Sequence, residues 1–168
     1  TDMRIPAEFR LGEEGGGYRI ALANLEGGRI GIAAQAVGMA RAAFEAARDY
    51  ARERTAFGKS IMEHQAVAFR LADMATDLEV CRTFLLRAAG ALDERAPDAT
   101  RLCAMAKKFV TDRCFAIAND ALQLFGGYGY LSDYGVEKIV RDLRVHQILE
   151  GTNEIMRVII ARSLISTR

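Results

Sequence analysis

Residues 64–92 read HQAVAFRLADMATDLEVCRTFLLRAAGAL, and this stretch decides the fold class. Nine of its positions recur at alternating spacings of three and four residues, which is the spacing of one face of an α-helix. At 1.5 Å per residue the face is about 43 Å long. A helix with so long a seam needs other helices to pack against, so the stretch predicts a helical bundle. The nine positions are His64, Val67, Leu71, Met74, Leu78, Cys81, Leu85, Ala88 and Leu92.

The segment before this seam is also helical in pattern. Residues 18–54 carry apolar side chains at steps of three and four, and the glycine pair Gly27-Gly28 is a place where that helix can break. The loop 55–59 ends it. Ser60 and Glu63 then have the S-x-x-E spacing of a capping box, which predicts the start of the second helix at Ser60.

Three further helices are predicted after the seam. Pro97-Asp98 starts the third, and the glycines within 126–130 stop it. A fourth is expected over 136–143, and a last one after Gly151-Thr152. Strand signals are nearly absent after residue 17. The fold class predicted is all-α, an up-down antiparallel four-helix-type bundle.

Residues 1–17 differ from the rest of the chain. Arg4-Ile5-Pro6 has the composition of an extended segment, and residues 12–17, GEEGGG, form a turn-rich stretch. We expect a short extended remnant and a linker over 1–17, followed by one helical domain over 18–168.

The composition narrows the function classes. The 168 residues carry 23 basic and 22 acidic side chains, a net charge of +1, which argues against a nucleic-acid binder with a basic surface. The longest nearly apolar run, 30–40, is about half the length of a membrane-spanning helix, and no export signal precedes it. Cys81, Cys103 and Cys114 are widely spaced, so we expect buried thiols and no metal site.

Three connections between the helices are unusual. Residues 54–60, RTAFGKS, place cations beside a helix N-terminus that favours a phosphate, although the pattern alone favours a plain loop with a cation at the C-terminus of the first helix. Residues 123–130, QLFGGYGY, let a flat ligand approach or simply end a helix. In residues 144–154, RVHQILEGTNE, Glu150 follows apolar neighbours. Loss of hydration there makes a carboxylate a stronger base, whereas a solvated acid at a helix start is the alternative.

Together these connections resemble a known family. The runs 54–59, 125–129 and 150–152, in this order and with 71–75 in the second helix, resemble the C-terminal domain of acyl-CoA dehydrogenases. The resemblance covers nearly the whole chain, and residues 145–151 are most similar to the isobutyryl-CoA or short-branched-chain type. It implies a flavin-dependent enzyme that converts a short or branched acyl-CoA to the 2-enoyl-CoA.

The resemblance assigns the catalytic base to Glu150. In the family, the glutamate before Gly-Thr takes the α-proton of the acyl-CoA, and the β-hydrogen leaves as hydride to N5 of the flavin. Some branches carry the base just before the arginine that matches Arg29, where this chain has Gly28. The presence of Glu150 and the lack of a carboxylate at Gly28 therefore both assign the base to Glu150. Arg29 matches a residue near the adenosine phosphates or ribose of CoA, and Gly151 is assigned to the substrate as well.

The resemblance also implies contacts with FAD. Arg54 and Phe57 match residues around the pyrophosphate and adenosine end of a neighbouring subunit's FAD. Gln123 and the backbone of Gly126 and Gly127 match a second contact on the adenosine side.

Two residues after the base match contacts with the subunit's own FAD. They are Thr152 and Glu154, and Glu154 stands where some relatives have glutamine, so its contact can differ. The expected cofactor-binding set is Arg54, Phe57, Ile61, His64, Gln123, Gly126, Gly127, Thr152 and Glu154.

The resemblance places the chain within a larger protein. Its partners would be its own N-terminal helical domain and β-domain, further copies of itself in a dimer or tetramer, and electron-transfer flavoprotein as acceptor. Residues 1–17 would then be the end of the β-domain and a linker. The isolated chain would be inactive, and the whole enzyme would work in a bacterial cytoplasm or a mitochondrial matrix.

Two other interpretations remain open at this point. The chain can be a helical self-association module without catalytic activity, because a long seam suits packing between chains as well. It can also come from an acyl-CoA oxidase-type relative, which would look the same in this region.

Overall fold

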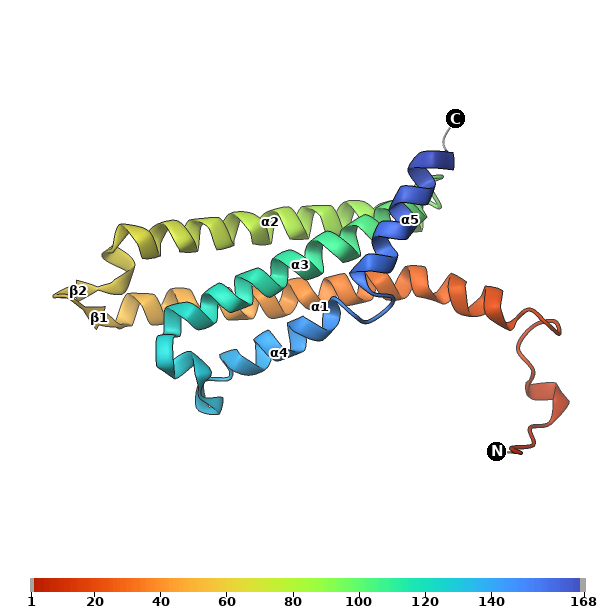
Figure 1. The fold of residues 1–168 in the computed structure, drawn as a ribbon, viewed down its shortest axis with the longest axis horizontal. Helices are drawn as coiled ribbons and strands as arrows, with labels where there is room; N and C mark the ends of the chain where they lie inside the picture. The colour runs from red at the N-terminus through yellow and green to blue at the C-terminus, as the bar shows by residue number, and fades with distance from the viewer. Residues whose placement is uncertain (1, 167–168) are drawn as a thin grey trace.

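The structure, a computed structural model, describes residues 2–166 and is dominated by helices (Figure 1). Three long helices run antiparallel and side by side: α1 (Gly17–Glu53), α2 (Gln65–Asp93) and α3 (Ala99–Phe125). The shorter α4 (Val136–His146) packs against α1 and α3, and α5 (Asn153–Ser166) crosses one end of α3. The predicted all-α, up-down bundle is confirmed.

Helix α3 lies at the centre and contacts each of the other four helices. Its interface with α1 is built from small side chains, because every buried apolar position on α1 is an alanine. Small side chains let two helix axes come close, since the distance between axes depends on what lies at the contact. The buried positions are Ala33, Ala36, Ala40, Ala43, Ala47 and Ala51 on α1 and, among others, Cys103, Ala106, Val110, Cys114, Ile117 and Ala121 on α3.

Helix α1 is unbroken at Gly27-Gly28, which corrects the break that the glycine pair suggested. A glycine in a helix interior costs about 1 kcal/mol relative to alanine. Packing of α1 along α3 outweighs that cost over a helix of 37 residues. The glycine pair therefore keeps one side of α1 bare without ending the helix.

The capping box at Ser60 is present, but it caps a short 3₁₀ turn, Ile61–Glu63, and not α2 itself. The Ser60 side chain accepts a hydrogen bond from the amide of Met62, and Glu63 accepts one from the amide of Ser60. Helix α2 begins after this turn, at Gln65, five residues later than predicted.

A small hairpin joins α1 to that turn, where strand signals were nearly absent. Strand β1 (Thr55–Ala56) pairs antiparallel with β2 (Lys59–Ser60). The two residues between them, Phe57 and Gly58, both have positive φ, at 52° and 81°. Positive φ at both central residues is the geometry that closes two-residue hairpins. The hairpin projects from one end of the bundle (Figure 1).

The N-terminal segment leads away from the bundle (Figure 1). Residues 2–6 form neither helix nor strand, and one 3₁₀ turn follows at Ala7–Phe9. A β-strand in this segment would need a neighbouring strand to pair with, and the described residues before α1 supply none. The division into 1–17 and 18–168 stays a prediction; Thr1, Arg168 and the residue before it lie outside the described residues.

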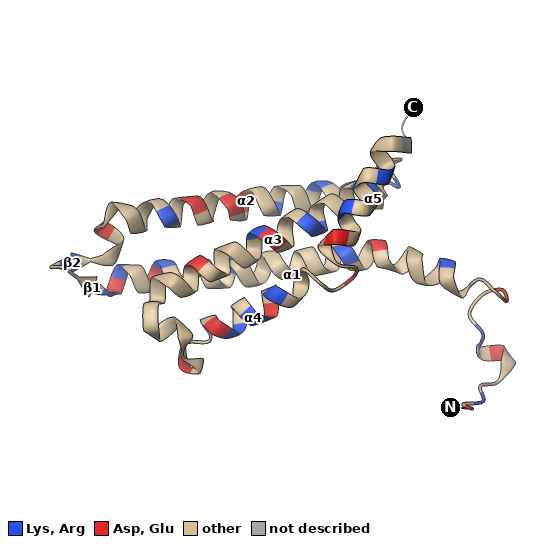
Figure 2. Cartoon of the chain, viewed as in Figure 1, with Lys and Arg blue, Asp and Glu red and all other residues tan. Residues whose placement is uncertain are grey.

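Acidic and basic side chains are interspersed along the helices (Figure 2). Most of the ion pairs lie within one helix at spacings of three or four residues, as between Arg41 and Glu45 or Lys108 and Asp112. Such pairs stabilise exposed helix faces by a few tenths of a kcal/mol each, about 0.2–0.5. Over residues 2–166, none of the helices is both long and apolar enough to span a bilayer.

Candidate active site

The loop between α4 and α5 holds Glu150 in an unusual backbone conformation. Glu150 has φ +55° and Gly151 has φ +88°, two successive residues in the left-handed region. A glutamate is sterically strained in this region, whereas glycine is not. Such a strained conformation is found where the surrounding structure imposes it. The amide of Asn153 donates to the carbonyl of Gln147 at 3.0 Å and closes the loop.

The Glu150 side chain lies against α1. A Cβ atom added at Gly28 would lie 2.4 Å from Oε2 of Glu150 and 2.8 Å from its carboxyl carbon. The carboxylate therefore occupies the space that any side chain at Gly28 would need. Here the absence of a side chain on one helix makes room for a carboxylate from a loop 122 positions further along the chain.

The apolar neighbours of Glu150 do not bury it, contrary to our expectation. Ile148 is 50% exposed and Leu149 is 41% exposed, so both side chains turn outward in this chain. Glu150 itself is half-buried, because its carboxylate packs against α1 at Gly28. The tertiary contact, and not the local sequence, shields one side of the carboxylate.

A buried polar network lies under the loop and was not predicted. Lys107 on α3 is fully buried, and its Nζ donates to the carbonyl of Gly151 and to Oδ1 of Asn153, both at 2.8 Å. Burial lowers the pKa of Lys107 to about 8, with Asp112 acting in the opposite direction. The sequence does indicate a buried lysine here. Lys107 lies four residues after Cys103 and three before Val110, which places it on the apolar face of its helix.

Arg29 is also buried, next to Gly28 on α1. It is 6% exposed, and its Nε has no hydrogen-bond partner within residues 2–166. A buried donor without an acceptor costs free energy, about 1–3 kcal/mol. The side chain therefore fits a site that gains an acceptor from elsewhere. Its assignment to CoA stays a prediction, and the burial places it in the protein interior, not on an exposed phosphate-binding surface.

Thr152 and Glu154 begin α5 beside this loop. The Thr152 hydroxyl accepts from the amide of Ile155 at 3.4 Å, and Glu154 pairs with Arg157 at 3.1 Å. Hydrogen bonding to its own backbone amide, and less strongly to Thr152, lowers the pKa of Glu154. Glu154 is exposed, so its carboxylate is accessible from outside the chain.

A second group of predicted residues gathers at the hairpin end of the bundle. Arg54, Ile61, Gly126 and Gly127 line one cavity of about 460 Å³. Three further side chains of the unusual stretch 123–130 complete it, Leu124, Phe125 and Tyr128, together with Tyr50 and Leu131, which the sequence did not single out.

The cavity combines a cation with aromatic rings. The Arg54 guanidinium lies 5.8 Å from the centre of the Tyr128 ring, and Tyr50 stacks on Phe125 with 4.3 Å between ring centres. Gly126 has φ +59° and ends α3 with a bare backbone at the cavity wall. A flat ring and an anionic group would both find complementary surfaces here.

Three other predicted cofactor residues lie near this cavity but do not line it. Phe57 is 96% exposed at the hairpin tip, with its ring edge-on to His64 at 6.1 Å between centres. Nε2 of His64 lies 3.1 Å from the carbonyl oxygen of Ala56, so His64 braces the hairpin. Gln123 is exposed on the last turn of α3.

The two groups lie at opposite ends of the bundle. Gly28, which meets Glu150, and Arg54 are separated by 26 positions along the continuous helix α1 and its C-cap. At 1.5 Å per residue that is about 40 Å. The Glu150 loop and the hairpin cavity are therefore two separate candidate sites on one copy of the chain. Within residues 2–166, no group of three or more His, Cys, Asp or Glu side chains could hold a metal ion.

Residues 15–165 match the family model described as acyl-CoA dehydrogenase, C-terminal domain. The chain belongs to this family. It is 52% identical over 164 residues to isobutyryl-CoA dehydrogenase, mitochondrial, of Bos taurus, covering 98% of this chain and 39% of that protein. It is 42% identical over 164 residues to the caffeyl-CoA reductase-Etf complex subunit CarC of Acetobacterium woodii, covering 98% and 43%.

A solved structure agrees with the fold of this acyl-CoA dehydrogenase domain. Butyryl-CoA dehydrogenase from Megasphaera elsdenii superposes with a TM-score of 0.92 at 42% identity, covering 96% of this chain and 42% of that one. The chain thus spans about two fifths of the length of the relatives it matches.

Proposed function

We propose that this chain is the C-terminal domain of an FAD-dependent acyl-CoA dehydrogenase that oxidises a short or branched acyl-CoA to its 2-enoyl-CoA. The position of Glu150 carries the proposal: the carboxylate lies in a break between helices, over the bare backbone of Gly28, in a chain of this family. The relatives named for isobutyryl-CoA and butyryl-CoA support a short acyl group.

Glu150 acts as the base in this proposal. Its carboxylate takes the α-proton of the thioester and becomes a carboxylic acid, and the electron pair of the Cα–H bond forms the Cα=Cβ bond as the β-hydrogen leaves with its own pair. Bound FAD would supply the acceptor for that hydride. Shielding of the carboxylate by α1 removes water from one side, which leaves it free to accept a proton.

The residues at both ends of the bundle fit FAD. At the hairpin end, the Arg54 guanidinium suits a pyrophosphate because it donates in a fixed fork, and the aromatic walls with Gly126 and Gly127 suit a flat adenine. At the other end, Thr152 and Glu154 would hold the subunit's own cofactor. The unpaired Nε of Arg29, one residue from Gly28, supports an acceptor from substrate or cofactor beside Glu150.

We further propose that the enzyme is a homo-oligomer, a dimer or tetramer. The hairpin cavity lies about 40 Å from Glu150 along one helix, so it would serve the FAD of a neighbouring copy. The isolated chain would be inactive, because the rest of the flavin site would come from the N-terminal and β-domains.

Electron-transfer flavoprotein is the proposed acceptor for the electrons. The relative from Acetobacterium woodii, named as a subunit of a complex with Etf, supports this partner. The bovine relative named as mitochondrial supports a matrix location if the source is eukaryotic, and a bacterial cytoplasm is the counterpart otherwise.

The test of the proposed base is Glu150→Gln in the full-length protein. Mixed without oxygen with isobutyryl-CoA, the variant should bleach its flavin about 10²- to 10⁴-fold more slowly than the wild type, because the amide cannot accept the proton. Glu79→Gln on the exposed face of α2 is the matched control and should bleach normally. Normal bleaching by Glu150→Gln would remove Glu150 as the base.

A further inference from the structure

The loop that carries Glu150 is clamped to α3 at both of its ends. Oδ1 of Asp112 accepts from the side-chain amide of Gln147 at 2.9 Å and from that of Asn153 at 2.7 Å. Gln147 precedes the loop and Asn153 follows it. One carboxylate on α3 therefore ties the entry of the loop to its exit.

Lys107 holds the middle of the same loop. Its Nζ donates to the carbonyl of Gly151, the residue directly after Glu150, and to Oδ1 of Asn153. Because Asn153 also donates to the hydroxyl of Thr111 at 3.0 Å, its side-chain amide is oriented on both sides. The carbonyl of Gly151 belongs to the Gly151–Thr152 peptide, one residue after the left-handed Glu150. Holding that carbonyl restrains the backbone of Gly151, and together with the bonds of Asp112 to both ends of the loop it restrains the path of the chain on which the direction of the Glu150 side chain depends.

The burial of Lys107 indicates that this position requires its ammonium group. Its side chain is 0% exposed on a helix face otherwise made of small and apolar residues. A lysine is rarely buried without being paired, and here its only acceptors within residues 2–166 are one backbone carbonyl and one amide oxygen in the Glu150 region. A core that only needed filling would use an apolar side chain at lower cost.

We propose that Lys107 is a positioning residue: it holds the carbonyl of Gly151 and the side chain of Asn153, and thereby keeps Glu150 left-handed with its carboxylate over Gly28. The proposal rests on the proposed role of Glu150 as base. Lys107 itself touches neither the substrate nor the reacting atoms. It acts only through the loop.

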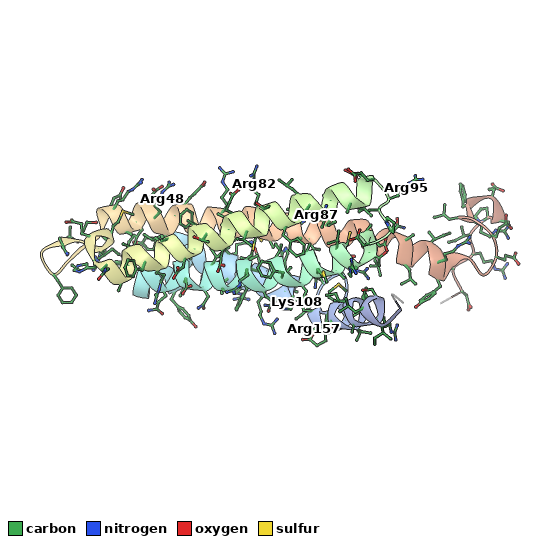
Figure 3. All side chains as sticks on the ribbon, turned by 90° about the horizontal axis from the view of Figure 1, so that it is seen from above. Arg48, Arg82, Arg87, Arg95, Lys108 and Arg157 are labelled. Atoms are coloured by element: carbon green, nitrogen blue, oxygen red, sulfur yellow. The ribbon has the colours of Figure 1, made fainter. Side chains whose placement is uncertain are left out.

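The test compares Lys107→Met with Arg82→Met in the full-length protein with FAD bound. Arg82 lies on α2, is exposed, pairs with Glu79 at 3.7 Å and projects from the edge of the bundle (Figure 3). Flavin reduction by isobutyryl-CoA is followed anaerobically over a range of substrate concentrations. Lys107→Met should lower the limiting rate about 100-fold, since displacing a catalytic group by about 1 Å costs that much. Arg82→Met should stay within about threefold of the wild type, because its ion pair with Glu79 is exposed and a surface ion pair contributes little.

Two readouts separate positioning from a purely structural role. With Lys107→Met, the half-saturating substrate concentration should stay near that of the wild type while the limiting rate falls. The isotope effect with 2-deutero-isobutyryl-CoA should rise, because proton removal becomes more rate-limiting. A wild-type limiting rate per bound flavin, even in a less stable variant, would overturn the proposal.

A second variant keeps the proposal testable if Lys107→Met fails to fold. Lys107→Gln keeps an N–H donor without the charge, and its limiting rate should fall between those of wild type and Lys107→Met. If both variants lose FAD while Arg82→Met keeps it, Lys107 serves the fold and the proposal is wrong. Glu150→Gln measured in parallel separates the two hypotheses: normal reduction by that variant rejects the base, whereas normal reduction by Lys107→Met alone rejects only the positioning role.

Discussion

The two ends of the helical bundle differ in how completely a single chain fixes their side chains. Around Gly28, a carboxylate fills the space above the helix, and a buried lysine and asparagine hold the loop that delivers it. Around Arg54, a hairpin projects with Phe57 96% exposed, and a cavity of about 460 Å³ opens beside it. One end has its positions set within a single chain. The other presents the ring of Phe57 outward and leaves a cavity lined by a cation and aromatic rings open.

This difference fits the division of labour between copies that we propose. The proposed base must lie within a fraction of an ångström of the atom it deprotonates, so its supports would be internal. The proposed contact to the cofactor of a neighbouring copy would be completed only after assembly, and it would therefore stay exposed in one chain.

The largest effect is expected at the internal end, from Gly28→Ala. The new Cβ would lie 2.4 Å from Oε2 of Glu150, and the carboxylate, as the free end of a flexible side chain, would move away. Flavin reduction in the full-length protein should slow by about ten- to a hundredfold. Stability should not fall, because alanine favours a helix interior over glycine by about 0.5–1 kcal/mol.

Gly31→Ala is the matched control for this prediction. It lies one turn further along α1, and an added Cβ there meets nothing within 4 Å. Both variants should gain a little in thermal midpoint, but only Gly28→Ala should lose activity. Equal activities in the two variants would mean that the close approach to Glu150 has no consequence for the reaction.

A smaller effect is expected at the exposed end, from Arg54→Ala. Removing the guanidinium should weaken FAD binding roughly tenfold in the assembled protein, since a hydrogen bond to a charged group contributes about 1.5–3 kcal/mol. The control is Arg52→Ala, an exposed arginine that pairs with Asp49 at 3.3 Å. Titration of apoprotein with FAD measures both, and equal affinities would break the assignment of this cavity to the cofactor.

The smallest effect concerns the pH dependence of stability. The pKa of Lys107 is about 8 in the folded chain against 10.5 for the free side chain. Between these values the unfolded state holds a proton that the folded state has released, so stability rises with pH in that window. The charged groups facing Lys107 are Arg29 on α1, Asp112 on α3, Glu150 in the loop and Glu154 on α5.

This rise is measured against Lys107→Met. In urea unfolding at pH 7.5 and pH 9.5, the wild type should gain at most about 2 kcal/mol relative to that variant. Arg82→Met should follow the wild type, because Arg82 is exposed on α2 and is not among the charged groups that face Lys107. An identical pH dependence of stability in wild type and Lys107→Met would show that burial does not lower the pKa of Lys107.

Sequence periodicity predicted the helices well and their junctions poorly. Of the nine seam positions in 64–92, Leu71, Met74, Cys81 and Ala88 are buried and the others are partly buried, because a long repeat averages over many contacts. The hairpin was missed because two-residue strands carry no periodic signal. The capping box at Ser60 was recognised, but its role is to shape a 3₁₀ turn, since the hairpin redirects the chain before α2 begins.

By itself the sequence determined the helical class, the order of the helices and the loop on which Glu150 lies, because each depends on neighbours within a few positions. Only the tertiary structure decided that Gly28 makes room for Glu150, that Lys107 holds Gly151, and that Arg54 and Gly127 share a cavity. These contacts join residues 44 to 122 positions apart. A local pattern cannot report such pairs, since they arise from how α1 and α3 pack and where that packing brings the loops.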